Sequence, residues 1–157
     1  MRALLLLCCA CAGSGGGRLT GRLARPRAPV QHFNLDARAK PCRGGHGVLV
    51  EAASSDGTGV LLWLRDDSLS AGEFLLRVAT DTTAGRAATG SLRYMTGDIG
   101  HGATLDSGLV RVTSGPPRLA GDIVARGVEM AGALHITFDG HFSDIALTSD
   151  TTTCSPT

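Results

Sequence analysis

The chain has 157 residues, a formal net charge of +1 and 43% hydrophobic residues. This length suits one domain with a leader and a tail, and the apolar fraction is enough for a packed core. Aromatic residues make up only 4% of the chain, so the core must consist mainly of Leu, Val, Ile and Ala. No apolar run approaches the roughly 20 residues that a membrane-spanning helix requires, which excludes a polytopic membrane protein.

The N-terminus has the pattern of a secretory signal. Arg2 provides a positive charge, residues 3–9 form a short apolar segment, and small residues follow it. An apolar segment of this length directs export and is too short to span a membrane as a helix. We therefore expect an exported protein in which residues 1–12 form the signal peptide.

Residues 7–11 (Leu-Cys-Cys-Ala-Cys) resemble the lipobox of bacterial lipoproteins, in which a small residue precedes a cysteine that is lipidated and becomes the new N-terminus. Ala10 and Cys11 match these two positions. Cys8 departs from the pattern, because an aliphatic residue is usual three positions before the lipidated cysteine. The resemblance implies a lipid anchor at Cys11. It also implies delivery to the outer membrane of a two-membrane cell, because Ala12 rather than an aspartate follows the anchor.

A second interpretation of the leader stays open. Residues 10–12 (Ala-Cys-Ala) also form an A-x-A cleavage site, which would release a soluble periplasmic or extracellular protein beginning at Gly13. The Gly/Ser-rich run at 13–17 favours the lipid anchor, because a flexible tether lets a domain stand away from a bilayer.

A basic segment follows the leader. Arg18 to Arg43 contains seven basic residues and one acid, whereas the chain from Gly44 onward has seven basic and thirteen acidic residues. Gly and Pro are frequent, so we expect a flexible linker over residues 13–43, with at most a short edge strand near 30–35. Nucleic acid is a poor partner, because the chain is exported and no aromatic residues alternate with the arginines. Clustered arginines attract anionic envelope surfaces such as lipid headgroups, and those expected to do so are Arg18, Arg22, Arg25 and Arg27.

Two cysteines lie near the ends of the expected domain, which covers residues 44–154. Cys42 and Cys154 are the thiols that remain after the leader and its anchor. In an exported protein such a pair predicts a disulfide, which would close a loop of about 110 residues. A metal site at Cys42 and His46 is not expected, because no C-x-x-C pair stands opposite them.

The rest of the chain alternates short apolar runs with Gly, Pro, Asp and Ser, which is typical of strands joined by turns. About seven to nine such strands predict an all-β fold, either an antiparallel β-sandwich or a small β-barrel. Trp63, the only tryptophan, lies in a run that is apolar on both faces and is expected to anchor the core. The expected strands are 47–53, 60–65, 73–80, 90–95, 109–113, 119–126, 133–139 and 142–147.

Residues 105–147 predict an antiparallel meander. Their apolar and glycine positions resemble the C-terminal half of many uncharacterised bacterial cell-envelope lipoproteins, which commonly finish with an apolar strand, a Gly and a Phe. The resemblance covers about a third of the chain and carries over no catalytic residue. The residues that carry it are Ser107, Gly108, Val110, Val112, Leu119, Gly121, Ile123, Leu134, Ile136, Phe138, Gly140 and Phe142.

The sequence contains none of the common motifs of serine hydrolases, zinc peptidases or nucleotide-binding proteins. His135, Asp139 and His141 share one face of an expected strand. His135 and His141 would lie about 20 Å apart along it, too far to share one metal ion. Asp139 and His141 would need a third ligand from another strand. We therefore expect no cofactor, no metal site and no catalytic residue here.

Two loop segments are the candidate ligand sites, because loops carry function more often than strands do. His101 lies between two glycines in an expected tight loop at 98–102. Asp66 and Asp67 lie in a polar connection, and they lack the spacing of a calcium site.

Three functional hypotheses follow. The leading one is a membrane-tethered envelope lipoprotein with a non-enzymatic binding or scaffolding β-domain, of unknown ligand and protein partner. The second is a soluble secreted barrel that carries an apolar ligand in a cavity lined by Leu62, Leu76 and Ile136. The third is a hydrolase or metal enzyme with a dispersed site, in which histidines such as His101 converge with aspartates in a cleft.

Overall fold

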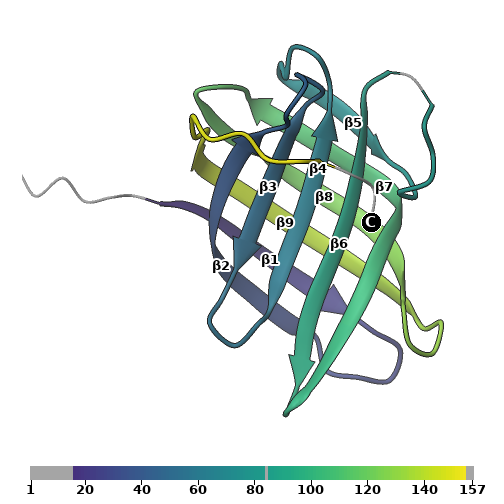
Figure 1. The fold of residues 1–157 in the computed structure, drawn as a ribbon. Helices are drawn as coiled ribbons and strands as arrows, with labels where there is room; N and C mark the ends of the chain where they lie inside the picture. The colour runs from purple at the N-terminus through teal and green to yellow at the C-terminus, as the bar shows by residue number, and fades with distance from the viewer. Residues whose placement is uncertain (1–15, 84, 155–157) are drawn as a thin grey trace, which may run out of the picture.

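The computed structural model describes residues 16–83 and 85–154. This part of the chain forms nine β-strands in one mostly antiparallel sheet that closes into a ring (Figure 1). The all-β prediction is confirmed. The strands are β1 (Gly17–Ala24), β2 (Gln31–Pro41), β3 (Val48–Ala53), β4 (Gly59–Arg65), β5 (Gly72–Leu76), β6 (Ala87–Thr96), β7 (Ile99–Ser114), β8 (Arg118–Glu129) and β9 (His135–Ala146).

The ring follows chain order except at β5. The strand order is β1-β2-β3-β4-β6-β5-β7-β8-β9, and β9 pairs antiparallel with β1 to close the sheet. The short β5 lies between β6 and β7 over part of their length. It pairs parallel with β6 at Leu75–Ala87 and antiparallel with β7 at Phe74–Val110. Beyond β5, β6 and β7 pair directly, so the ring is less regular here than a simple up-and-down barrel.

The core fills the inside of the ring, because alternate residues of each strand point inward. On β8 the inward row runs from Gly121 through Ile123 and Ala125 to Gly127 and Glu129. The first four of these are small or apolar, as an eight- or nine-stranded ring requires when side chains fill its interior.

Residues 17–41 correct the predicted linker. Gly17–Ala24 and Gln31–Pro41 are strands of the ring, so a flexible linker over residues 13–43 is wrong for this part of the chain. Leu19, Phe33 and Leu35 lie in the core. The alternation of these apolar residues with polar ones outweighs the Gly, Arg and Pro content that suggested a linker. The prolines fall mainly in the turn between the two strands.

The C-terminal meander is confirmed, with longer strands than expected. β7, β8 and β9 pair in succession, and β9 runs without interruption through Gly140. Leu134 falls within the expected strand 133–139, but it lies in the turn before β9 and is 48% exposed. The expected tight loop at 98–102 is also wrong, since only a two-residue turn separates β6 from β7 and His101 is part of β7.

The two ends of the ring differ. Hairpin turns between β1 and β2, β3 and β4, β6 and β7, and β8 and β9 lie at the lower end of the view in Figure 1. The β4–β5 and β5–β6 connections and the C-terminal segment lie at the upper end. Among residues 16–83 and 85–154, no helix is long and apolar enough to cross a membrane.

Candidate functional site

A buried polar cluster closes the lower end of the ring. Tyr94 of β6 and His101 of β7 are register partners, and Glu129 of β8 is the partner of the nearby Ala103, so all three side chains point into the same end. The Tyr94 hydroxyl donates a hydrogen bond to the Glu129 carboxylate. The Arg25 guanidinium lies 4.8 Å above the Tyr94 ring, and its Nη1 is 4.0 Å from Glu129 Oε1.

Tyr94 and Glu129, at the centre of this cluster, are almost fully enclosed. Tyr94 is 0% exposed and Glu129 is 5% exposed. The His101 ring stacks on the Tyr94 ring, with 4.9 Å between centroids and 6° between planes. A buried carboxylate of this kind needs compensating charge and hydrogen bonds, and Arg25 and Tyr94 supply them.

Burial, followed by the hydrogen bond to Glu129, raises the pKa of Tyr94 to about 12. The phenol therefore stays protonated at neutral pH and acts as a donor to the carboxylate. Neither it nor the enclosed Glu129 is placed to meet a substrate in this arrangement, because neither is open to solvent.

Two polar atoms at this end have no hydrogen-bond partner among the described residues. They are Nε of Arg25 and Oε1 of Gln31, and both are buried. Gln31 uses its other polar atom, since Nε2 donates to the Met95 carbonyl at 2.6 Å.

The sequence singled out His101 at this end but missed Arg25 and Glu129 as its neighbours. His101 is half-buried in β7 rather than exposed at a loop tip, which corrects its predicted role as a loop ligand. The signal for Glu129 was available: it continues the inward alternation of Ile123, Ala125 and Gly127. Arg25 belonged to the expected linker, and its burial depends on a turn that sequence periodicity does not specify.

A second polar group lies at the upper end, in a pocket of about 480 Å³ that we call the upper pocket. It contains the other two candidate residues, Asp66 and Asp67. Arg86 Nη2 lies 2.9 Å from Asp66 Oδ2, and His46 Nδ1 lies 3.4 Å from Asp67 Oδ1. Despite that short distance, Asp66 Oδ2 accepts no well-aligned hydrogen bond. Asp66 is thus paired with an arginine and Asp67 lies beside an imidazole, and the two aspartates do not form a joint acidic site.

Arg65 adds a further cation to the upper pocket. Its Nη1 donates to the Asp81 carbonyl at 2.8 Å, and its guanidinium lies 5.6 Å from the centre of the Trp63 ring. Its Nε and Nη2 are buried and have no partner in the described part of the chain. Hydrogen bonds from Thr83 lower the pKa of the Asp81 carboxyl, which is therefore occupied by its own loop.

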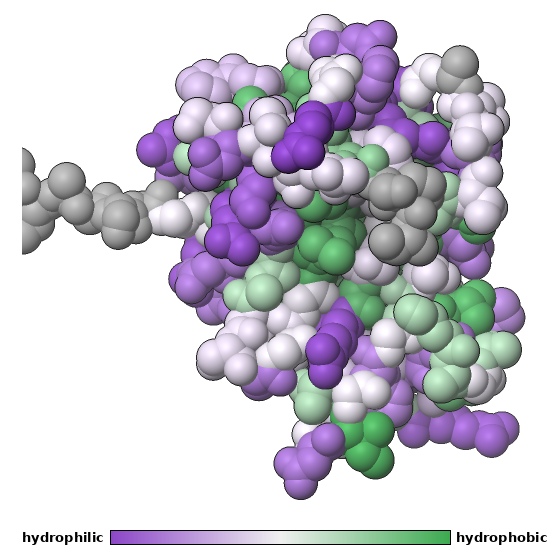
Figure 2. All heavy atoms as spheres, in the orientation of Figure 1, coloured by the Kyte–Doolittle hydropathy of each residue, from purple (hydrophilic) through white to green (hydrophobic). Residues whose placement is uncertain are grey.

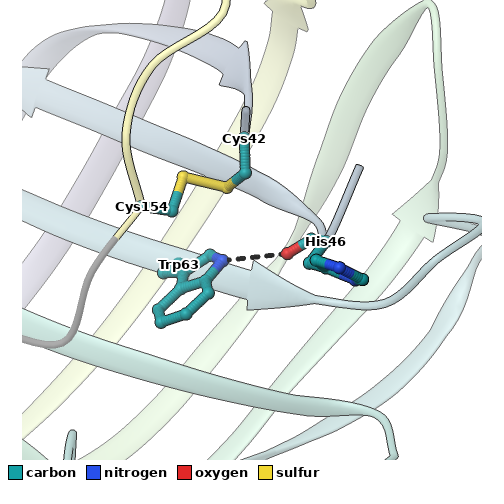
Figure 3. The surroundings of a disulfide bond; sticks show 4 residues. All are labelled: Cys42, His46, Trp63 and Cys154. Carbon is teal, nitrogen blue, oxygen red and sulfur yellow. Dashed lines mark hydrogen bonds between the residues drawn. A yellow bond between two sulfur atoms is a disulfide. The ribbon is translucent and has the colours of Figure 1, made fainter. Parts of the chain in front are cut away.

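Trp63 and the disulfide form the rim of this pocket (Figure 3). Trp63 was expected in the core, but it lies on the outer face of β4, where its Nε1 donates to the His46 carbonyl at 3.2 Å. The inward positions of β4 are taken by Val60, Leu62 and Leu64. A run that is apolar on both faces does not specify which face turns inward, and the register of the ring decides it.

An apolar groove of about 330 Å³ adjoins the upper pocket across Trp63 and Cys154, which line both. Leu61 and Val78 lie in it and are 47% and 48% exposed. Leu49 contributes from β3, where it is the register partner of Trp63. Figure 2 shows hydrophobic surface exposed near the centre of this face, between hydrophilic regions.

The predicted disulfide is confirmed. Cys42 and Cys154 are bonded, with 5.4 Å between their Cα atoms and 112 positions between them in the sequence. The bond fastens the C-terminal segment at the end of β2, where Cys42 and Thr152 also form a β-bridge. The predicted lipid anchor, Cys11, lies outside the described residues.

The histidines of β9 do not form a site together. His141 Nδ1 lies 2.9 Å from Asp122 Oδ1 of β8, both side chains being more than half exposed on the outer surface. Asp139 faces Arg22 and Val124 across its neighbouring strands, and His135 is exposed at the start of β9. Within the ranges that the structure describes, no group of three or more His, Cys, Asp or Glu side chains could hold a metal ion.

The four arginines proposed to bind an anionic surface also separate. Arg25 is buried at the lower end, and Arg18 is engaged by Asp36 at 2.8 Å. Arg22 and Arg27 remain exposed, one on β1 and one in the turn that follows it. Arg25 is mostly enclosed, with its side chain 12% exposed, and the other three are exposed, so binding of an anionic surface by these arginines stays a prediction.

Comparisons with protein-family models, with characterised proteins and with solved structures found no match to this chain.

Proposed function

We propose that this protein is a membrane-tethered lipoprotein of the cell envelope, whose β-ring serves as a non-enzymatic binding or scaffolding domain. The observation that carries the proposal is the position of β1. It begins at Gly17, six positions after Cys11. Six extended residues span at most about 20 Å, so an anchor at Cys11 would hold the ring close to the bilayer surface.

The short tether changes what such an anchor does. A linker of 31 residues would have let the domain range far from the membrane, as the expected boundaries 13–43 implied. With β1 starting at Gly17, the ring is restricted to molecules at or near the membrane. This suits a domain that binds a lipid, a neighbouring envelope protein or a soluble molecule delivered to that surface.

The arrangement of ionisable groups supports binding over catalysis. The densest cluster, around Glu129, is buried and internally paired, and the pair His141–Asp122 lies on an open outer face. General acid–base catalysis needs such a group within hydrogen-bond reach of a bound substrate. Neither place combines a titratable group with space for a substrate. In the upper pocket, which has such space, Asp66 is paired with Arg86, and Asp67 lies beside His46.

The packing of the interior disfavours a carrier of apolar molecules in the ring. Three residues were expected to line a ligand cavity: Leu62, Leu76 and Ile136. All three belong to the packed hydrophobic core. Their exposed fractions are 0%, 4% and 2%. The soluble form of the protein remains the alternative if the leader is cleaved before Gly13.

Cell fractionation of the wild type and a Cys11→Ser variant tests the tether. We expect the wild-type protein in the membrane fraction, resistant to high salt and released by detergent. Cys11→Ser should be soluble or stay unprocessed, because no other cysteine occupies the lipidated position. Equal membrane association of both, with normal leader cleavage, would contradict the proposal.

A further inference from the structure

We propose that the upper pocket and the adjoining apolar groove form one binding site for an amphipathic anion, with a carboxylate or phosphate head and an aliphatic chain. Trp63 and Cys154 line both hollows, so the two lie next to each other on the surface. One is basic and the other is apolar, and a ligand that fills both must carry both kinds of surface. The site stands on these residues alone and does not require the lipid anchor.

The basic part lies around Arg65. The upper pocket contains the three arginines Arg43, Arg65 and Arg86, against the two aspartates Asp66 and Asp67. Arg86 is occupied by Asp66. Arg43 and Arg65 have no carboxylate partner among the described residues, so the pocket keeps an excess of positive charge.

Arg65 identifies the head group most directly. Its Nε and Nη2 are adjacent donors of one planar guanidinium, the geometry that binds two oxygens of a carboxylate or phosphate. Both are buried without an acceptor, which is unfavourable for a charged group. A bound oxyanion would remove this deficit. Because both atoms are closed off from solvent in this structure, binding requires a local rearrangement of side chains at the pocket wall.

The apolar groove would bind the aliphatic chain of the ligand. Leu49, Leu61 and Val78 line the groove on the far side of Trp63 from the upper pocket, and the latter two are about half exposed. Apolar side chains with this exposure on adjoining elements gain stability when an aliphatic chain covers them. Charge at one end and apolar surface at the other therefore select a fatty acid or the head and upper chains of an anionic lipid.

The test uses the full chain with Cys11→Ser, which avoids acylation and the need for detergent. Trp63 is the only tryptophan, so its fluorescence reports on the site, and calorimetry measures the same binding independently. The probes are octanoate, acetate, 1-octanol and dihexanoyl phosphatidic acid. We expect saturable binding of octanoate at least about tenfold tighter than acetate, because several methylene groups become buried.

The uncharged probe isolates the head group without any further substitution. 1-Octanol should bind at least about tenfold more weakly than octanoate, because it offers no charge to Arg65. Dihexanoyl phosphatidic acid distinguishes an anionic lipid from a free fatty acid as the natural ligand. Tighter binding of this lipid than of octanoate would assign the site to a lipid headgroup, and the reverse to a free fatty acid.

Two substitutions separate the halves of the site, and a third is the control. Arg65→Gln should weaken octanoate about tenfold. Leu61→Ser, at a position that is 47% exposed, should weaken octanoate binding and leave acetate binding unchanged. Arg111→Gln removes an arginine that pairs with Glu73 at 2.8 Å on the outer surface, and should change neither. Absence of saturable octanoate binding, equal affinity for 1-octanol, or unchanged affinity in Leu61→Ser would each overturn the proposal.

Discussion

Inside the lower end of the ring, the hydroxyl of Tyr94 donates to the carboxylate of Glu129, and both side chains are removed from solvent. Arg25 supplies the compensating positive charge from the β1–β2 turn. The three residues come from segments that are far apart in the sequence, so their contact exists only when the ring is closed. The interaction energy between these residues therefore reports whether the lower end of the ring is closed.

Replacing either Arg25 or Glu129 alone should destabilise the fold more than replacing both. Glu129→Leu leaves the Arg25 guanidinium buried without its carboxylate and should lower the free energy of unfolding by about 3–5 kcal/mol. Arg25→Met should destabilise the fold for the converse reason. The double variant should recover part of the loss, because neither charge is then left alone. Urea denaturation of the four proteins measures this cycle, and simple additivity would show that the two charges do not interact.

The ionisation of Tyr94 should make the protein sensitive to alkaline pH. Its pKa is about 12 in the folded chain against 10.0 for an unperturbed tyrosine, so folding favours the protonated phenol. This contribution is fully present below pH 10 and is lost between pH 10 and pH 12, at about 1.4 kcal/mol per pH unit. Urea denaturation across this range should show the decline.

Tyr94 is the only tyrosine, so its ionisation can be followed by absorbance without interference from another phenol. The control is Tyr94→Phe, which should start less stable and lose the added decline between pH 10 and pH 12. If the absorbance of the folded wild-type protein shows that the Tyr94 phenol ionises with a midpoint near pH 10, the burial of this hydroxyl is contradicted.

The strand pattern of the sequence specified much of the sheet, because inward and outward residues alternate in it. The strands near Val48–Ala53 and Gly59–Arg65 and the meander of β7 to β9 follow from that alternation. Cys42 and Cys154 could be paired from their number and the expected compartment alone. The closure of the sheet into a ring rests on the pairing of β1 with β9, which is a long-range contact that periodicity does not report.

The candidate sites were harder to predict, because each depends on which face of a strand turns inward. Trp63 was expected inside and lies outside, where it joins the upper pocket to the apolar groove. Arg25 was expected in a solvated linker and is buried beside Glu129. Asp66 and Asp67 were correctly placed in a connection, but Arg43 and Arg86, which line the same pocket, come from two other segments.

Close packing between β7 and β8 should make Gly127 intolerant of a side chain. A Cβ at this position would lie 2.0 Å from the Thr104 carbonyl oxygen, which belongs to the backbone and cannot rotate away. We expect Gly127→Ala to lower the free energy of unfolding by about 1–3 kcal/mol. Gly16→Ala is the matched control, since nothing lies within 4 Å of its added Cβ, and thermal denaturation of both variants compares them. Equal stability of the two would contradict the close strand contact.

The disulfide should contribute strongly to stability because it joins residues 112 positions apart. On the chain-entropy account a loop of this length contributes up to about 4–5 kcal/mol, and measured values are usually smaller. The double variant Cys42→Ser/Cys154→Ser should therefore unfold at lower urea concentration than the wild type. Reductant should bring the wild type to the same midpoint and leave the variant unchanged. A midpoint that does not respond to reductant would argue against the bond.

The intact mass of the mature protein, extracted from membranes, tests the central claim most directly. A tethered lipoprotein predicts a chain that begins at Cys11 and carries a diacyl or triacyl modification, with the mass of one internal disulfide. An unmodified chain that begins at Gly13 would contradict the tether and identify a soluble exported protein instead.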